Sequence, residues 1–219
     1  MASTESGGKT IIVGITGASG ALLAQTALRL LAADARVARV HVVITDAGFR
    51  LLDQELGIAS GAADLPARLI GSAAGGFAKI EVLPNADIGA SIASGSYSAD
   101  AMCVIPCSMG ALSAIASGAS TDLLSRAADV SLKEGRRLVL CVRDTPFSRI
   151  HLENMMRAQQ AGAVIMPAIV SFYHQPKTID DLVSQYVCRV LAQIGLPQTQ
   201  QFTWQGGSAG GGASKARSA

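Results

Sequence analysis

The feature that most constrains the fold is a short apolar run that ends in a loop of glycine, serine and threonine. The run covers Thr10–Ile15, the loop covers Thr16–Gly20, and a helical pattern follows over Ala21–Leu31. An unbroken run of β-branched residues is typical of a buried parallel strand. Glycines let the backbone approach an anion closely, and the first N–H groups of the next helix carry partial positive charge. The arrangement predicts a phosphate-binding loop at a helix N-terminus.

The spacing of the glycines in this loop narrows the choice of ligand. It is Gly14-x-x-Gly17-x-x-Gly20, not the G-x-G-x-x-G of dinucleotide-binding folds. The loop also lacks the Gly-Lys-Ser/Thr ending of a P-loop, which disfavours a nucleoside triphosphate. The hydroxyl groups of Thr16 and Ser19 suit the phosphate of a mononucleotide such as FMN. The alternative is a tight turn that only packs helix on strand.

Composition excludes several classes of protein. The 219 residues are 49% apolar, which is enough for the core of one domain. A net charge of +2, with dispersed basic residues, does not indicate a nucleic-acid partner. No apolar run approaches the roughly 18 residues of a membrane span, and the N-terminus lacks the apolar region of a signal peptide. We therefore expect no membrane segment and a cytoplasmic location.

Strand-like and helix-like segments alternate along the chain. The predicted strands are Thr10–Ile15, Val40–Ile44, Lys79–Val82, Ala101–Ile105, Leu138–Val142 and Ala163–Met166. The predicted helices are Ala21–Leu31, Ala47–Glu55, Ala111–Ser117, Leu123–Glu134, Ile150–Ala161 and Ile179–Ile194, with one short helix inside Gly57–Gly76. This alternation predicts a single-domain, doubly wound α/β fold (Rossmann-like, flavodoxin-like), a parallel sheet with helices on both faces. The domain covers residues 10–197, between a flexible start (1–9) and a disordered Gly/Ala/Ser-rich tail (206–219).

In such a sheet, ligands gather beyond the carboxyl ends of the strands. Polar or glycine-containing turns follow the second, fourth, fifth and sixth strands, and Ser94-Gly95-Ser96 precedes the fourth. Turn residues collect at strand ends in any α/β domain, which is the alternative reading for each of them. Arg143 and Arg126 indicate an anionic partner more strongly, although salt bridges to Asp144 and Asp129 would also satisfy them.

The four cysteines do not have the spacing of a zinc site or a disulfide framework, and three histidines leave few candidate metal ligands. Cys103 and Cys141 lie inside apolar strands, where a reduced thiol acts as a small hydrophobe. We expect no metal.

Several blocks of the sequence together resemble one family. They are G-I-T-G-A-S-G-A, A-S-G-S, P-C-S-M-G-A-L-S-A-I-A-S-G, L-L-S-R-A-A-D-V-S-L-K-E-G-R-R-L-V-L, H-L-E-N-M, G-A-V-I-M-P-A and F-Y-H-Q-P. In this order they resemble the UbiX/Pad-type flavin prenyltransferases from about Thr10 to about Leu196. The resemblance implies an enzyme that uses dimethylallyl phosphate to prenylate reduced FMN at N5 and C6, without a metal. The product, prenylated FMN, would serve a UbiD-type decarboxylase, and the enzyme would be a large homo-oligomer, by resemblance a dodecamer, with sites at subunit interfaces.

The resemblance also implies roles for individual residues. The resemblance implies that the flavin is bound by Gly17, Ala18, Ser19, Thr45, Cys107, Ser108, Met109, Gly110 and Arg143. It implies that dimethylallyl phosphate is bound by Ser94, Gly95, Arg126, Lys133, Tyr173 and Arg189. Ser19 and Asp144 are the expected catalytic residues.

The chain departs from the family pattern at two positions. Asp144 follows Arg143 where the family usually has glutamate, which shortens the carboxylate side chain by one methylene. Ile88 stands where some members have tryptophan. The alternatives are an FMN-dependent cysteine decarboxylase, for which a catalytic histidine near Ile88–Ser94 is missing, and a non-catalytic flavin-binding protein. A nicotinamide-dependent enzyme with Asp46 on the ribose is disfavoured by the glycine spacing.

Overall fold

The computed structural model describes residues 7–62, 64–71 and 77–203. Most of the predicted flexible start and the whole predicted tail lie outside the described residues. The segment Gly57–Gly76 lies partly outside them, and its described part contains the expected short helix, α3 (Leu65–Ile70).

The domain is built on one parallel sheet of six strands. The strands are β1 (Lys9–Ile15), β2 (Val37–Ile44), β3 (Ile80–Pro84), β4 (Ala101–Cys107), β5 (Arg137–Val142) and β6 (Val164–Ile165). Their order is β3-β2-β1-β4-β5-β6, and every neighbouring pair is parallel. This is the Rossmann strand order, so the predicted fold is confirmed.

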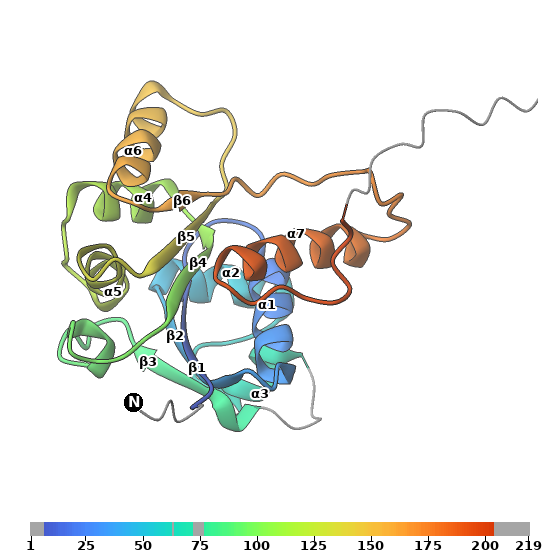
Figure 1. The fold of residues 1–219 in the computed structure, drawn as a ribbon, viewed down its shortest axis with the longest axis horizontal. Helices are drawn as coiled ribbons and strands as arrows, with labels where there is room; N and C mark the ends of the chain where they lie inside the picture. Colours follow the sequence, from blue (N-terminus) through green and yellow to red (C-terminus); the bar gives the residue numbers. More distant parts are fainter. Residues whose placement is uncertain (1–6, 63, 72–76, 204–219) are drawn as a thin grey trace, which may run out of the picture.

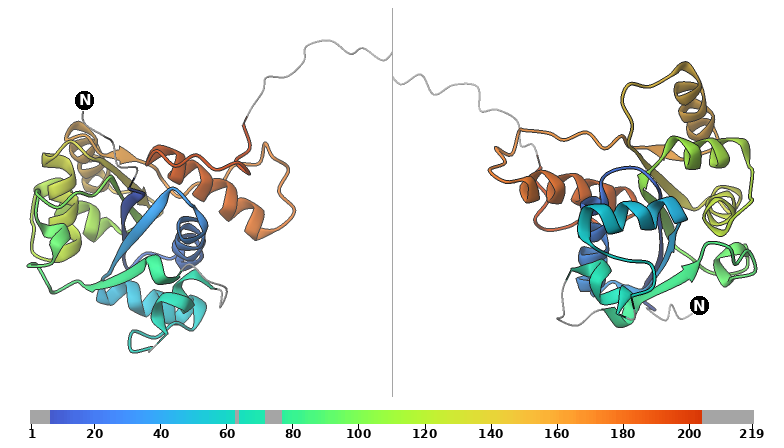
Figure 2. Two further views of the ribbon diagram at one scale, coloured as in Figure 1. Left: turned by 60° about the horizontal axis from the view of Figure 1, so that its bottom comes forward. Right: turned by 180° about the vertical axis from the view of Figure 1, so that it is seen from behind.

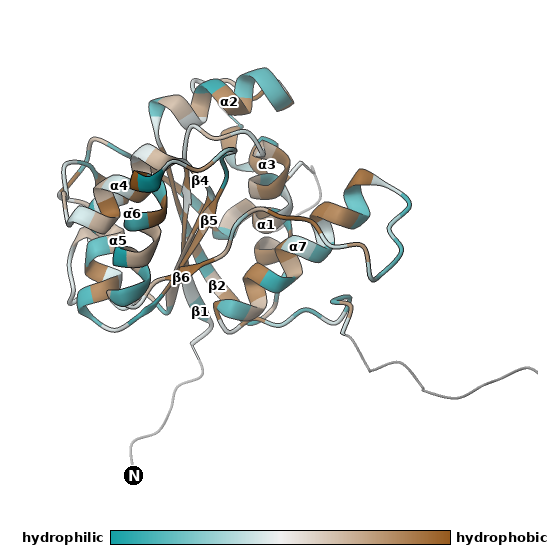
Figure 3. Ribbon diagram, turned by 90° about the horizontal axis from the view of Figure 1, so that it is seen from above, coloured by the Kyte–Doolittle hydropathy of each residue, from teal (hydrophilic) through white to brown (hydrophobic). Residues whose placement is uncertain are grey.

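Helices cover both faces of this sheet (Figure 1). They are α1 (Ala21–Ala33), α2 (Asp46–Leu56), α3, α4 (Met109–Ser117), α5 (Leu123–Lys133), α6 (Arg149–Gln160) and α7 (Ile179–Gln193), with short 3₁₀ turns at η1 (Phe77–Lys79) and η2 (Ser91–Ala93). Seen from above, α4, α5 and α6 lie on one side of the strands and α1, α3 and α7 on the other (Figure 3).

The strand residues alternate between two hydrophobic clusters. Ile11, Val13 and Ile15 of β1 face the α1 and α7 side, whereas Ile12 faces the α4 and α5 side. Both sets are fully buried, which explains why the strands appear in the sequence as unbroken apolar runs. Two views from other directions show α7 packed along α1, with the chain after β6 extending away from the sheet before it returns into α7 (Figure 2).

The structure extends several elements beyond their predicted ends. β2 begins at Val37, three residues before the predicted start, because Lys9 and Thr10 of β1 continue the pairing with Val37 and Arg39. Ala38 and Arg39 are exposed, so the hydrophobic pattern does not mark this part of the strand. The remaining boundaries agree with the predictions to within about two residues.

Strand order reverses between β1 and β4, whose chain connections run to opposite sides of the sheet. A parallel sheet opens a crevice beyond its carboxyl ends at such a point. The loop Thr16–Gly20 after β1 and the turn Ser108–Gly110 after β4 meet there.

Candidate active site

The loop after β1 is pressed closely against α2. A Cβ atom on Gly17 would lie only 2.4 Å from the Cβ of Ala47, and one on Gly48 would lie 2.7 Å from the carbonyl oxygen of Ile15. Real side chains do not tolerate such contacts, so glycine is required at both positions. The glycines thus serve helix packing as well as any approach of a ligand.

Thr16 joins the two loops at the switch point. Its hydroxyl donates to the carbonyl oxygen of Pro106 at 2.8 Å and accepts from the backbone N–H of Ser108 at 2.8 Å. The side chain is buried, and its one proton is already donated. The expectation that the Thr16 hydroxyl binds phosphate is therefore wrong: the hydroxyl fixes the loop geometry instead.

The N-terminus of α1 is already capped by a carboxylate. Glu55, at the end of α2, accepts from the backbone N–H of Ala21 at 2.7 Å and of Gly20 at 3.0 Å. A negative charge is stabilised at this end of a helix. Glu55 thus takes the N–H groups that the sequence assigned to a phosphate, and that part of the expectation needs correction.

Two other helix N-termini converge on a small cavity beside the loop. The cavity holds about 180 Å³ and is lined by Gly17, Thr45, Ser108, Gly110 and neighbouring residues of α4 and α5. Asp122 also lines it, and its carboxylate accepts from the N–H of Ser125 at 2.8 Å as the cap of α5. Thr45 caps α2 by accepting from the N–H of Gly48 at 3.0 Å, and Ser108 caps α4 by accepting from the N–H of Ala111 at 3.3 Å. The earliest N–H groups of both helices have no partner within the helix, so this cavity suits an anion.

Arg143 supplies an unpaired donor at the same edge of the sheet. It follows β5, and its backbone N–H donates to the carbonyl oxygen of Cys107 at 3.1 Å. Its side-chain Nε is buried and has no hydrogen-bond partner. A buried guanidinium donor left unpaired is costly, so the atom fits a ligand acceptor such as those of a flavin. Asp144 does not pair with it: the Asp144 carboxylate is exposed and accepts from the N–H of Thr145 at 2.8 Å.

The remaining residues carried over to the flavin differ in accessibility. Ser19 and Gly110 are exposed, Ser108 and Met109 are half-buried, and Ala18 is buried. The Cys107 side chain is fully buried, and burial raises the pKa of its thiol well above the ordinary range. Cys107 therefore meets any ligand only through its backbone. Cys103 and Cys141 are buried and reduced, as predicted.

Tyr173 and Arg189 lie together in a second place. They line a groove of about 390 Å³ between the segment that follows β6 and the helix α7. The hydroxyl of Tyr186 donates to the carbonyl oxygen of Met166 at 2.7 Å, which fastens this segment to α7. The groove thus has a cation and an aromatic side chain on a fixed support.

Ser94, Gly95, Arg126 and Lys133 form a third group. A Cβ on Gly95 would meet the Glu134 carboxylate first and would lie 2.6 Å from the Nζ of Lys133. The Nε of Arg126 donates to the carbonyl oxygen of Ala93 at 3.1 Å. Arg126 also pairs with Asp129 at 2.8 Å, so the salt bridge weighed as an alternative is present. Lys133 pairs with the adjacent Glu134.

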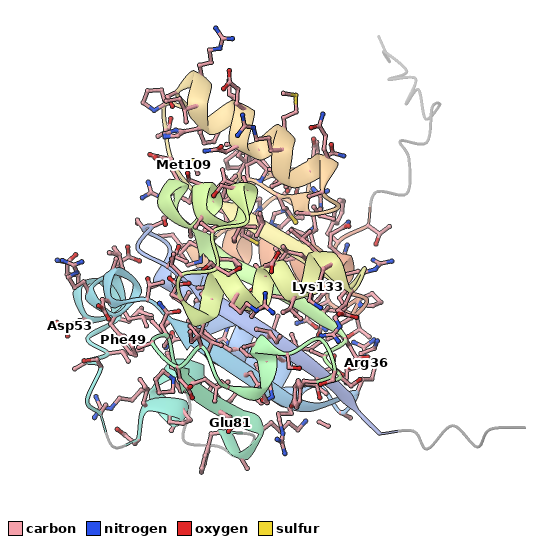
Figure 4. All side chains as sticks on the ribbon, turned by 90° about the vertical axis from the view of Figure 1, so that its left-hand side faces the viewer. Arg36, Phe49, Asp53, Glu81, Met109 and Lys133 are labelled. Carbon is pink, nitrogen blue, oxygen red and sulfur yellow. The ribbon has the colours of Figure 1, made fainter. Side chains whose placement is uncertain are left out.

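One chain does not bring this third group to the cavity at the switch point. Helix α5 runs antiparallel to the strands, so Lys133 at its end lies toward the amino ends of the strands. Figure 4 shows Lys133 well away from Met109, the first residue of α4. The predicted site residues therefore occupy three separate places on one chain.

The fold and the cavity define a class of protein: a Rossmann-type domain with a small cavity at its switch point, lined by the N-termini of α2 and α4. The family model described as Flavoprotein matches residues 1–191. A flavin prenyltransferase UbiX from Halalkalibacterium halodurans is 45% identical over 193 residues, which cover 88% of this chain and 91% of the relative. One from Pseudomonas aeruginosa is 44% identical, covering 91% of this chain and 95% of the relative. The chain belongs to the UbiX family of flavin prenyltransferases.

Solved structures agree with this assignment. AnUbiX in complex with FMN and dimethylallyl pyrophosphate is 38% identical, with a TM-score of 0.77, and covers 91% of this chain and 99% of that one. A dodecameric FMN-dependent UbiX-like decarboxylase from Escherichia coli is 40% identical, with a TM-score of 0.78, over 90% and 100% of the two chains. A cysteine decarboxylase of thioviridamide biosynthesis, 13% identical with a TM-score of 0.56, shares the fold. The predicted enzyme class and its flavin, FMN, are confirmed.

Within the described part of the chain, no three or more His, Cys, Asp or Glu side chains gather as a metal site. None of its helices is long and apolar enough to cross a membrane.

Proposed function

We propose that this chain transfers the dimethylallyl group of dimethylallyl phosphate to N5 and C6 of reduced FMN and releases prenylated FMN and phosphate in the cytoplasm. The observation that carries the proposal is the buried, unpaired Nε of Arg143 at the carboxyl edge of the sheet that also holds the anion cavity. The product would be consumed by a UbiD-type decarboxylase.

The flavin would be held at the switch point between β1 and β4. The N-termini of α2 and α4, with Thr45 and Ser108, would receive its phosphate. Arg143 would donate to the ring system, while Gly17, Ala18, Met109 and Gly110 leave room along it. Cys107 would contribute only backbone atoms, since its side chain faces the hydrophobic interior.

The allylic phosphate needs cations that a single chain keeps apart. Tyr173 and Arg189 lie on the groove beside α7, whereas Ser94, Gly95, Arg126 and Lys133 lie around η2 and the end of α5. We infer that a neighbouring copy completes each site, in a homo-oligomer that would be a dodecamer. The dodecameric Escherichia coli relative supports this inference.

Reduced FMN supplies the electron-rich N5 and C6 atoms. In the transfer, the carbon–oxygen bond of dimethylallyl phosphate breaks while its C1 bonds to N5, which gives up its proton. The carbon–carbon double bond of the prenyl group then takes up a proton at C2 while its C3 bonds to C6, and C6 loses its proton. Lys133, Arg126 and Arg189 would stabilise the charge that develops on the departing phosphate. Asp144, which is exposed beside Arg143, would accept the C6 proton, and Ser19 would orient the reacting groups.

The test is anaerobic turnover followed by mass spectrometry of the extracted flavin. Wild-type protein with reduced FMN and dimethylallyl phosphate should yield a flavin heavier by one C5 prenyl unit. Asp144→Asn should lower kcat by about 100-fold with FMN affinity unchanged, the lower end of what a general base contributes. Unmodified FMN in the wild-type reaction would refute the proposal and direct attention to cysteine-containing substrates.

A shared site has its own test. Lys133→Ala and Tyr173→Phe should each be nearly inactive alone, and mixed oligomers of the two should regain part of the activity. If mixing restores nothing although hetero-oligomers form, each site is confined to one chain.

A further inference from the structure

A partly buried hydrogen bond connects the residue after the Ser94–Ser96 turn to a strand of the sheet. Tyr97 follows the turn directly, and its hydroxyl lies 2.6 Å from the Nε2 of His41, in the middle of β2. The two rings meet edge to face, with centroids 5.4 Å apart. His41 is only 1% exposed, so this contact joins an exposed turn to a rigid strand.

The surroundings of His41 favour one direction for this hydrogen bond. Its Nδ1 lies 3.2 Å from a carboxylate oxygen of Glu81, its neighbour in register on β3. Nδ1 makes no hydrogen bond to that oxygen, but the negative charge of Glu81 stabilises a proton on Nδ1. In this tautomer Nε2 has no proton and accepts from the Tyr97 hydroxyl. Burial lowers the pKa of His41 and favours this neutral ring, while Glu81 opposes the shift and Arg39 adds to it.

Backbone and side-chain hydrogen bonds connect the turn to Tyr97, so a shift of Tyr97 would move the turn. The N–H of Tyr97 donates to the carbonyl oxygen of Ser94 at 3.2 Å, and the hydroxyls of Ser94 and Ser96 lie 2.8 Å apart. On the other side, Arg136 donates from Nη2 to the carbonyl oxygen of Gly95 at 2.7 Å. The turn is therefore held between His41 of β2 and Arg136, the residue that directly precedes β5.

These anchors matter because the turn itself offers little rigidity. Ser94 and Ser96 are exposed, and the residue between them, Gly95, is a glycine, the residue type with the most backbone freedom. A phosphate site made of small polar residues binds well only if its donors are already ordered, because ordering them on binding costs affinity.

We propose that His41, acting through the Tyr97 hydroxyl, is a positioning residue that orders the Ser94–Ser96 turn for the phosphate of the allylic substrate. The inference rests on the proposed function, in which this turn contacts dimethylallyl phosphate. Neither His41 nor Tyr97 touches the reacting atoms in this arrangement.

Tyr97→Phe is the direct test because it removes only the hydroxyl. It keeps the ring, which packs on the hydrophobic cluster on the α4 and α5 side of the sheet. The KM for dimethylallyl phosphate should rise by about fivefold, the effect of one lost hydrogen bond. The kcat and the Kd for FMN should stay unchanged. A matched control is Ser131→Ala, which removes a buried hydroxyl that donates to Ala127 at 2.8 Å on α5, and it should leave all three constants unchanged.

A double-mutant cycle isolates the pair. In His41→Leu/Tyr97→Phe, the KM should be no higher than in His41→Leu alone, since both changes break the same contact. If His41→Leu does not fold, the Tyr97→Phe result decides by itself. An unchanged KM in Tyr97→Phe, or a loss of FMN affinity and thermal stability in step with KM, would overturn the positioning role.

Ser94→Ala separates this inference from the proposed function. If Ser94→Ala raises the KM and Tyr97→Phe does not, the turn binds substrate and the positioning role alone is refuted. If neither variant changes the KM while wild-type protein prenylates FMN, the turn does not contact the substrate, and the inference falls with that assignment.

Discussion

The Glu55 carboxylate accepts a hydrogen bond from the backbone N–H of Ala21 at 2.7 Å and so joins the end of α2 to the beginning of α1. The same oxygen accepts from Gly20 at 3.0 Å. The loop Thr16–Gly20 lies between these two helices. Glu55 on α2 therefore holds the end of the loop through hydrogen bonds from Gly20 and Ala21. Thr16 holds the beginning of the loop through its hydrogen bonds with Pro106 and Ser108.

Removing this cap should cost stability. We expect Glu55→Ala to lower the free energy of unfolding by about 1–2 kcal/mol, because two N–H groups at the helix start lose their acceptor. Glu55→Gln, which keeps an acceptor oxygen, should lose less. Chemical denaturation measures both. Glu153→Ala, which removes an exposed ion pair with Arg149, should change the unfolding free energy by less than about 0.5 kcal/mol and serves as control.

Gly17→Ala should damage the packing of the loop on α2. The added methyl group would lie 2.4 Å from the Cβ of Ala47, so one of the two segments must move. We expect a loss of about 2 kcal/mol in unfolding free energy, typical of overpacking, together with weaker FMN binding. Gly61→Ala, where nothing lies within 4 Å of the added atom, should leave both unchanged. Equal stability of the two variants would contradict the close contact.

Arg143→Lys should weaken FMN binding although the positive charge is kept. The lysine ammonium cannot reproduce the donor at Nε, which is buried and unpaired in the protein alone. We expect the Kd for FMN to rise by about tenfold, equal to about 1.4 kcal/mol, in a flavin-fluorescence titration. Arg149→Lys, on the exposed end of α6, is the control and should bind FMN like wild type. A Kd equal to that of wild type in Arg143→Lys would place the flavin elsewhere.

The fold could be predicted because the sequence features that indicate it are short segments of consecutive residues. Each buried strand is an unbroken apolar run, and the glycine loop after Ile15 marks the switch point. Thr45, Ser108 and Arg143 could be found for the same reason, since each directly follows a strand and so reaches the carboxyl edge of the sheet.

The corrections all involve contacts between residues distant in sequence. Glu55 lies 35 residues from Gly20, and nothing at the end of α2 marks it as a cap for another helix. The His41–Tyr97 contact, for which the sequence analysis makes no prediction, likewise joins residues 56 positions apart. Thr16 was assigned to a ligand because a hydroxyl in a glycine loop suits phosphate, whereas its actual partners lie about 90 residues away.

The acid stability of the domain should depend on Asp34, at the end of α1. Its carboxylate accepts from Nε and Nη2 of Arg36, at 2.9 and 2.6 Å, and from Gln198 at 3.2 Å. The Arg36 hydrogen bonds hold the pKa of Asp34 well below its usual range, against the opposing effect of burial. A carboxyl group with a lowered folded-state pKa stabilises the fold above its unfolded pKa of about 3.9, and this contribution is lost as the pH falls below that value.

Asp34→Asn should therefore lower Tm by about 3 °C at pH 7. The difference from wild type should shrink as the pH is lowered from about 4 toward 2, because wild type then loses the same contribution. Asp64→Asn is the control: Asp64 pairs with Arg68 in an exposed ion pair, and such pairs contribute little. Thermal melts across this pH range decide the matter. A Tm difference between wild type and Asp34→Asn that stays constant down to pH 2 would show that Asp34 stabilises the end of α1 through packing rather than through its charge.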